Sequence, residues 1–155
     1  MEFFTRLVTV RYAIGSFRIV DSEHQMKSCK LIRNEGETYH GKQGFDYFSG
    51  ISKESAGSEA LCMHLLTIPP GVSAEPHYHE AHESAIYVLE GEAEMKHGPR
   101  LEYVMRVKAG DFIYIPAGVP HQPYNPTDNP VRAVIARTDP KEQESVVLLA
   151  SKPKK

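Results

Sequence analysis

Short apolar runs separated by turn-forming residues dominate the chain from residue 61 onward. Each run is rich in β-branched, aliphatic or aromatic residues and is closely followed by glycine, proline or aspartate. Short runs at a spacing of roughly eight to twelve residues are typical of an all-β sandwich or barrel. We therefore expect strands over residues 61–68, 84–89, 93–96, 101–107, 112–115 and 131–137, with a weaker candidate at 146–149.

The pattern is less regular before residue 61. Polar residues over 52–59 predict a loop, and helix signals are weak throughout, with a single candidate turn at 140–143. The β-prone pieces of this part of the chain lie at 7–12, 16–20 and 28–33, separated by Gly15, a turn at 34–36 and Gly41.

A length of 155 residues fits one domain that buries its own core without disulfides or structural zinc. No internal repeat of solenoid length is present. We expect a single domain over residues 1–155, with N-terminal strands and loops at 1–58, a barrel core at 59–137 and a C-terminal strand and tail at 138–155.

The charge balance and the termini narrow the cellular setting. A net charge of -2 gives no basic excess for nucleic acid. Arg6 and Arg11 interrupt the N-terminal apolar stretch, so it lacks the core of a signal peptide, and no run approaches the length of a membrane span. Cys29 and Cys62 form no disulfide framework. We expect a soluble, cytoplasmic protein that binds neither nucleic acid nor membrane.

Histidines supply the candidate chemistry. His77 and His79 are two residues apart, and side chains at this spacing on a strand share one face. His121 follows the turn at 116–120, just after a predicted strand. A chance His-x-His pair and a hydrogen-bonded turn histidine are the ordinary alternatives, and the ordered turns between them favour a shared site. Three neutral imidazoles suit iron, copper, nickel, zinc or cobalt and leave coordination positions open.

These residues resemble the two signature motifs of the cupin superfamily. Gly71, His77, His79, Glu83 and Gly91 are similar to the first motif, in which glycine, His-x-His, glutamate and glycine follow one another. The second motif is matched without departure, by Gly110, Pro116, Gly118, His121 and Asn125. The resemblance implies an all-β cupin double-stranded β-helix, or jelly-roll barrel, that holds one divalent metal ion per chain (Fe, Mn, Ni, Cu, Co or Zn).

One position departs from the first motif. Counting back six residues from Gly91, the place of the glutamate ligand holds Ser84, and Glu83 stands one residue earlier. A shift of one residue on a strand turns the side chain to the opposite face. Glu83 reaches the metal only if a bulge or the loop at 80–82 reorients it. Otherwise the site is a three-histidine triad with Ser84 lining the pocket. We favour Glu83 as fourth ligand, with His82 as a weaker candidate.

Alternation along the strands suggests further pocket residues. If Ser84 faces inward, Ile86 and Val88 do so too, and an inward even-numbered face before Pro69 would add His64 and Leu66. For His64 we favour a satisfied core histidine over a substrate contact. Arg137 would neutralise an anionic substrate if it points inward and would have no role as a surface residue. The remaining candidates lie close to the second motif: Tyr114, Gln122 and Tyr124.

The resemblance leaves the reaction open. A metal-dependent enzyme acting on a small molecule is the leading interpretation, with dioxygenase-type chemistry or sugar or carbonyl isomerase or lyase chemistry. The alternative is a non-catalytic cupin that binds or senses a small ligand. In small cupins an N-terminal strand often pairs with the neighbouring subunit, which hides an exposed sheet edge. We therefore expect a homodimer.

Overall fold

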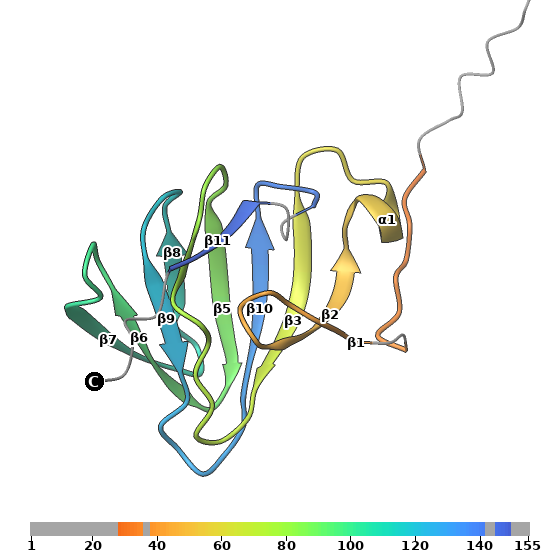
Figure 1. Cartoon of the computed structure of the whole chain (residues 1–155). Helices are drawn as coiled ribbons and strands as arrows, with labels where there is room; N and C mark the ends of the chain where they lie inside the picture. The colour runs from red at the N-terminus through yellow and green to blue at the C-terminus, as the bar shows by residue number, and fades with distance from the viewer. Residues whose placement is uncertain (1–27, 36–37, 142–144, 150–155) are drawn as a thin grey trace, which may run out of the picture.

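The computed structural model describes residues 28–35, 38–141 and 145–149, and it consists almost wholly of antiparallel strands (Figure 1). Within these residues no helix has the length and apolar character that crossing a membrane requires. The elements in chain order are β1 (Thr38–His40), β2 (Asp46–Ile51), α1 (Lys53–Ala56), β3 (Cys62–Ile68), β4 (His77–His79), β5 (Ser84–Glu90), β6 (Glu92–His97), β7 (Tyr103–Lys108), β8 (Phe112–Ile115), β9 (His121–Tyr124), β10 (Val131–Arg137) and β11 (Val146–Leu148).

Two antiparallel sheets enclose the core, which confirms the all-β barrel. The six-stranded sheet has the order β1-β2-β3-β10-β5-β8, and the five-stranded sheet has the order β11-β4-β9-β6-β7. Figure 1 shows β3, β10 and β5 side by side in the middle of the molecule. Most neighbours in these sheets are distant in sequence, so the chain crosses repeatedly between the two layers.

The strands predicted from residue 61 onward are confirmed. β8 and β10 have the predicted bounds, and the strands predicted at 61–68, 84–89, 93–96, 101–107 and 146–149 are found within two residues of them. β4 and β9, which carry the three histidines, are short strands that the apolar pattern does not mark. They form because they pair with strands that are distant in the sequence.

Two predictions for the N-terminal part are wrong. Residues 28–33 form no strand, because they are mostly exposed and pair with no strand of the described part. Residues 52–59 contain the short helix α1, which Ser52 and Ser55 start with a reciprocal capping box. Gly57 ends it in the left-handed conformation, with φ of 71°. The β-prone pieces at 7–12 and 16–20, and half of the candidate turn at 140–143, lie outside the described residues.

Side chains alternate between the core and the outside along the central strands. On β3 the even-numbered residues are buried, from Cys62 to Ile68. On β10 the odd-numbered residues are buried, from Val131 to Arg137. Because both sets point into the space between the sheets, apolar burial of about 1.5–3 kcal/mol for each large side chain stabilises the barrel. Free thiols occur at Cys62, in this core, and at exposed Cys29.

Asn125, the last residue of the second motif, ties a long turn to the barrel. Its fully buried side chain donates from Nδ2 to the carbonyl oxygens of Ile68 and Asn129, at 3.0 and 2.7 Å. Its Oδ1 accepts from the backbone N–H and hydroxyl of Thr127, at 3.0 and 2.8 Å. A buried amide with both ends bonded is stable in the core. The asparagine therefore fixes the connection between β9 and β10.

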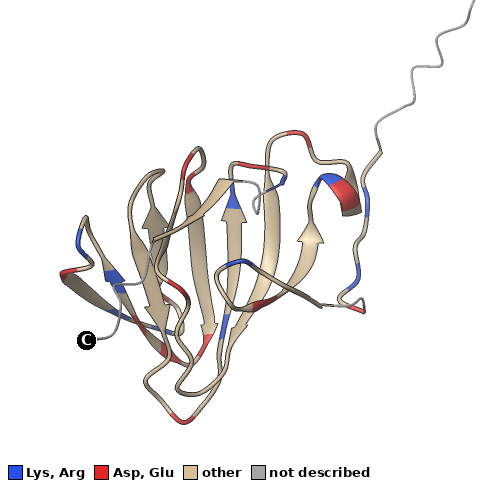
Figure 2. Cartoon of the chain, viewed as in Figure 1, with Lys and Arg blue, Asp and Glu red and all other residues tan. Residues whose placement is uncertain are grey.

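Charged residues show no preference for one element. Figure 2 shows lysine, arginine, aspartate and glutamate distributed over loops, strand ends and α1. Two ion pairs join neighbouring strands, Arg106 with Glu94 at 3.0 Å and Arg132 with Glu90 at 3.9 Å. Their side chains are partly exposed, so each pair contributes little to stability.

We predict that Gly91→Ala destabilises the fold more than Gly110→Ala. Both glycines have a positive φ, 81° and 95°, so alanine is strained at either position. A Cβ at Gly91 would lie 2.7 Å from the carbonyl oxygen of Pro130, whereas a Cβ at Gly110 would meet nothing within 4 Å. We expect about 1 kcal/mol for the backbone strain in each variant, and a clearly larger loss for Gly91→Ala. Urea unfolding of both variants measures the difference, and equal losses would contradict the prediction.

Candidate metal centre

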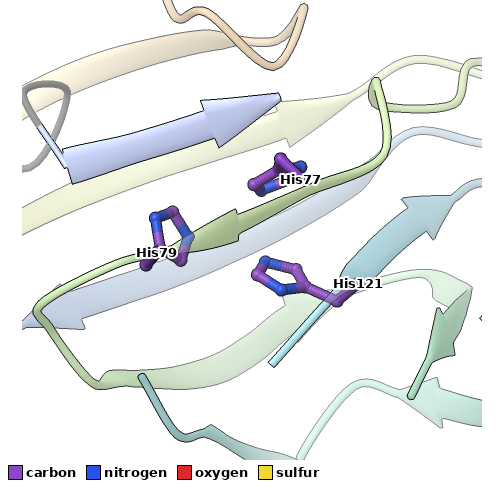
Figure 3. A group of neighbouring side chains, drawn as sticks. All are labelled: His77, His79 and His121. Carbon is purple, nitrogen blue, oxygen red and sulfur yellow. The ribbon is translucent and has the colours of Figure 1, made fainter. Parts of the chain in front are cut away.

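Three buried histidines meet inside one end of the barrel. His77 and His79 occupy the two ends of β4, and His121 begins β9, where it pairs in register with His77. Their side chains are only 2, 2 and 3% exposed, and one ring nitrogen from each lies within 4.8 Å of the others. Figure 3 shows the three rings around a common space. The alternation predicted for His-x-His is confirmed, since both rings point to the same face.

The turn of the second motif holds the two strands together. The N–H of Gly118 donates to the carbonyl oxygen of His79 at 2.7 Å, and the N–H of Gly98 donates to that of Pro120 at 3.1 Å. Gly118 has a φ of 75°, a conformation that glycine adopts without strain. The turn therefore places His121 beside β4 even though only one register pair joins β4 to β9.

Backbone carbonyls fix two of the rings. Nδ1 of His77 lies 2.6 Å from the carbonyl oxygen of Glu75, and Nδ1 of His121 lies 2.9 Å from that of Val119. A carbonyl only accepts, so Nδ1 carries the proton and the lone pair is on Nε2. Metal-binding histidines are commonly held in this way by their second nitrogen.

Burial keeps the imidazoles neutral. Desolvation, with a smaller contribution from the charge of Arg137, lowers the pKa of His79 far below its usual range. Desolvation and the neighbouring His77 lower the pKa of His121 to about 3, against a small opposing effect of its hydrogen bond to Val119. The neutral form is the one that binds a metal, so the ligands are ready at physiological pH.

The donor set fits a divalent transition metal. The lone pairs converge, and Nδ1 of His79 is buried without a hydrogen-bond partner among the described residues. Such an arrangement is unfavourable unless a cation is shared. Three imidazoles without a carboxylate suit iron, cobalt, nickel, copper or zinc rather than magnesium or calcium. His77, His79 and His121 are therefore the residues that would hold the ion.

A largely apolar cavity adjoins the histidines. Ser84 and Arg137, which are partners in the register between β5 and β10, line it beside the three rings. Leu66, Ile86 and Val88 face it as the alternation predicts. The remaining lining is mostly apolar and comes from both sheets: Phe45, Tyr47, Ile68, Ala93, Met95, Val107, Ile113, Ile115, Pro123, Val131, Ala133 and Ile135, together with Glu94.

The structure does not bring Glu83 to the histidines. Ser84 is buried and faces the cavity, and Glu83 is exposed on the other side of the strand. Its carboxylate accepts a hydrogen bond from the hydroxyl of Tyr114 at 2.8 Å, which raises the pKa of Tyr114. The register of β5 with β10 shifts between Arg132 and Ala133, far from Glu83, so no bulge turns the carboxylate inward. Tyr114 itself is 61% exposed and does not line the cavity.

Other candidate histidines lie close by with different contacts. His64 is buried on β3 and packs edge-on against Tyr39 and against Tyr47, a cavity residue, but it does not itself line the cavity. His82 stacks on His79, with ring centres 4.3 Å apart. Nδ1 of His82 lies 2.5 Å from the hydroxyl of Ser145, which ties it to the C-terminal segment. The stacking places His82 against one side of the His79 ring, which it supports.

Sequence reasoning missed Phe45 and Tyr47 as cavity residues. Both are 2% exposed and belong to the part of the chain where the apolar pattern is irregular. Phe45 and Tyr47 lie two residues apart, which was the available signal. Gln122 is partly buried and donates to the carbonyl oxygen of Ala74 at 3.0 Å, and Tyr124 is also partly buried.

Comparison with known proteins identifies the fold. Residues 64–136 match the family described as a cupin domain. The polyketide cyclase RemF from Streptomyces resistomycificus is 23% identical, with a TM-score of 0.65 over 81% of this chain and 88% of that one. No curated protein sequence matches significantly.

Two further solved structures, each named as a different enzyme, share the architecture. A mutant of Bacillus subtilis oxalate decarboxylase is 24% identical, with a TM-score of 0.63 over 74% of this chain and 30% of that one. A putative sugar phosphate isomerase from Acidithiobacillus ferrooxidans is 22% identical, with a TM-score of 0.56 over 68% of each chain. At these identities the likeness establishes the fold, and the chain spans less than a third of that oxalate decarboxylase.

We predict that the metal-free protein loses stability as the pH falls below about 6.5. His79 and His121 have folded-state pKa values below the ordinary value, so the unfolded state binds more protons, and acid favours it. Each such group contributes a slope of at most about 1.4 kcal/mol per pH unit between its two pKa values. Urea unfolding of metal-free protein at several pH values between 7 and 5 measures the slope.

A variant assigns that slope to the site. His121→Asn removes one titrating ring, so its stability should fall less steeply with acid than that of the wild type. His40→Asn, which changes an exposed histidine, is the matched control and should keep the wild-type slope. Equal slopes in the wild type and His121→Asn would contradict the prediction.

Proposed function

We propose that this chain, in which residues 64–136 match the cupin domain family, is a metal-dependent enzyme that acts on a small molecule. The observation that carries the proposal is the convergence of three buried imidazoles, His77, His79 and His121, beside an apolar cavity. A purely structural role does not explain why three nitrogen lone pairs lie close together inside the barrel. Three protein ligands leave positions for a substrate or water.

The chain's own residues supply positioning and the exclusion of water. When bound, the ion would act as a Lewis acid on a substrate oxygen or bring oxygen to it, which covers isomerase, lyase and dioxygenase-type reactions. The carbonyls of Glu75 and Val119 orient the rings of His77 and His121. The apolar walls, such as Val88 and Ile135, keep bulk water away from the reacting atoms and strengthen the electrostatic interactions there.

We propose a site of three histidines without a carboxylate ligand. Glu83 was expected as the fourth ligand, and its exposed position and hydrogen bond to Tyr114 support the three-histidine alternative. Ser84, on β5, lines the cavity beside the three histidines that would hold the ion. We also place the protein in the reducing cytoplasm, a proposal supported by the free thiols of Cys29 and Cys62.

Elemental analysis of protein purified without chelator or affinity metal tests the site. We expect about one divalent iron, manganese, nickel, copper, cobalt or zinc ion per chain in the wild type. His77→Ala and His121→Ala should lose it, because two remaining imidazoles bind far more weakly. Glu83→Gln should keep it, as should His40→Ala, the exposed control.

Two outcomes would overturn parts of this proposal. Loss of metal in Glu83→Gln would make Glu83 the fourth ligand after all. A wild-type protein that contains no metal and takes up none of the six ions would remove the metal-dependent enzyme. A non-catalytic cupin that binds or senses a small ligand would then be the better account of the cavity.

We further propose a homodimer. The expectation was made for the N-terminal strands and loops at 1–58, of which residues 1–27 and 36–37 lie outside the described residues. Support comes from β8, which is an edge strand whose Phe112 is 83% exposed and packs against Tyr87, with ring centres 4.7 Å apart. An exposed aromatic edge of this kind is a usual place for subunits to meet.

Light scattering measures the assembly. The expected mass is twice the 17.4 kDa of one chain. Phe112→Asp should shift the protein to the monomer by placing a charge in the contact. Tyr103→Asp, at an exposed aromatic on β7, is the control and should stay dimeric. A monomeric wild type at micromolar concentration would refute the homodimer.

A further inference from the structure

We infer that the substrate is a small apolar molecule with one anionic oxygen group, a carboxylate or enolate, bound by Arg137 and Ser84 next to the three histidines. The inference rests on the proposed function, because it names the substrate class of that same site. It separates the reactions left open above, since it favours an apolar acid or enol over a sugar.

The walls of the cavity select an apolar body. Its lining beyond the histidines is mainly aliphatic and aromatic, as at Phe45, Leu66, Val88 and Ile113. A sugar or sugar phosphate would bury several hydroxyl groups against these side chains. Each hydroxyl left without a partner costs roughly 1–3 kcal/mol, equivalent to about a five- to 150-fold loss of affinity. Apolar carbon meets no such cost.

Arg137 places one positive charge at the wall of this apolar space. It ends β10 on the inner face, is 4% exposed and lines the cavity together with the three histidines. Its guanidinium lies 5.8 Å from the centre of the Tyr47 ring, which itself stacks on Tyr39. The aromatic ring therefore holds the guanidinium in place from one side.

The field of this charge reaches the centre. The guanidinium and the three histidine rings line the same cavity, so the positive charge acts across a mostly apolar space that screens it weakly. An anionic oxygen located between Arg137 and the histidines would therefore experience a net positive potential.

Ser84 supplies an independent observation. It is 2% exposed, lines the same cavity, and its hydroxyl has no hydrogen-bond partner among the described residues. Buried hydroxyls are nearly always bonded, so an unpartnered one that lines a cavity indicates a ligand with an acceptor atom. Ser84 and Arg137 are register partners on adjacent strands, and such side chains are about 5 Å apart at Cβ. One acceptor group can reach both.

The acidic residue of the cavity does not cancel this charge. Glu94 on β6 lines the cavity, and its carboxylate accepts from Nε of Arg106 at 3.0 Å. The side chain of Arg106 is 86% exposed, so this pair lies toward solvent. The inner part of the cavity, where Ser84 and Arg137 meet the histidines, therefore favours an anion.

Ligand titrations of metal-free and of zinc-loaded protein, monitored by NMR of the ¹⁵N-labelled chain, test the inference. Benzoate probes an apolar carboxylate, benzyl alcohol is its neutral counterpart, acetylacetone probes an enolate, and glucose 6-phosphate probes a polar anion. We expect benzoate to bind metal-free protein about tenfold or more tightly than benzyl alcohol, as a charge-assisted hydrogen bond implies. Acetylacetone should bind the zinc-loaded form if the enolate is the better fit.

Variants identify the residues. Arg137→Met should abolish the preference for benzoate over benzyl alcohol, and Ser84→Ala should weaken benzoate binding by a few fold. Arg132→Met is the matched control, because Arg132 is on the same strand with its side chain half exposed on the outer face. Should Arg137→Met fail to give a folded spectrum, Ser84→Ala carries the test together with Arg137→Lys, which keeps the charge but loses the guanidinium fork and should therefore show a reduced but not abolished preference for benzoate.

The outcomes separate this inference from the proposed function. A benzoate preference that depends on Arg137 in metal-free protein supports the anion site even if the chain binds no metal. Tighter binding of glucose 6-phosphate than of benzoate would overturn the apolar substrate class. Equal affinity for benzoate and benzyl alcohol without tight acetylacetone binding, or no binding of either anion probe at millimolar concentration in both forms, would overturn the anion site.

Discussion

Burying three imidazoles side by side is possible only while they remain uncharged, and the surrounding structure satisfies this constraint. The carbonyls of Glu75 and Val119 each accept a hydrogen bond from one ring Nδ1–H, which leaves the lone pairs of His77 and His121 on the opposite nitrogens. The guanidinium of Arg137 disfavours protonation of His79 and His121 from the wall of the cavity. The same arrangement that prevents a proton from binding leaves the site open to a metal ion.

Much of the fold follows from the spacing of apolar and turn residues. Strands such as β8 and β10 are confirmed because their alternation and flanking glycines and prolines are local signals. The short helix α1 is missed because it depends on the reciprocal capping box between Ser52 and Ser55. This box lies in a polar segment without an apolar period. Strands β4 and β9 form only because distant segments pair with them, and no local pattern contains that information.

The site shows the same division. Strand periodicity and the order of the turns predict a site shared by His77, His79 and His121, and the structure brings these three side chains together. Glu83 shows where counting fails, because one residue of shift exchanges the inner face for the outer one. Ser84 faces inward, as the alternative required. Phe45 and Tyr47 reach the cavity from residues before β3, a relation set by sheet order rather than by sequence distance. Solved structures with this architecture are named as several different enzymes. The residues that line the cavity, rather than the fold, therefore distinguish this chain.

The position of the last strand has a consequence for how the protein is made. β11 pairs with β4 over three residues, including Val146 with His79 and Leu148 with His77, whereas β9 pairs with β4 at one position. On the ribosome, the nascent chain has already produced all three histidines before residues 146–148 are synthesised. The strand that carries two of them therefore lacks its longer neighbour until residues 146–148 have emerged. Both edges of β4 can be paired only after that point, so the geometry of the three-histidine cluster is completed later than the histidines themselves are made.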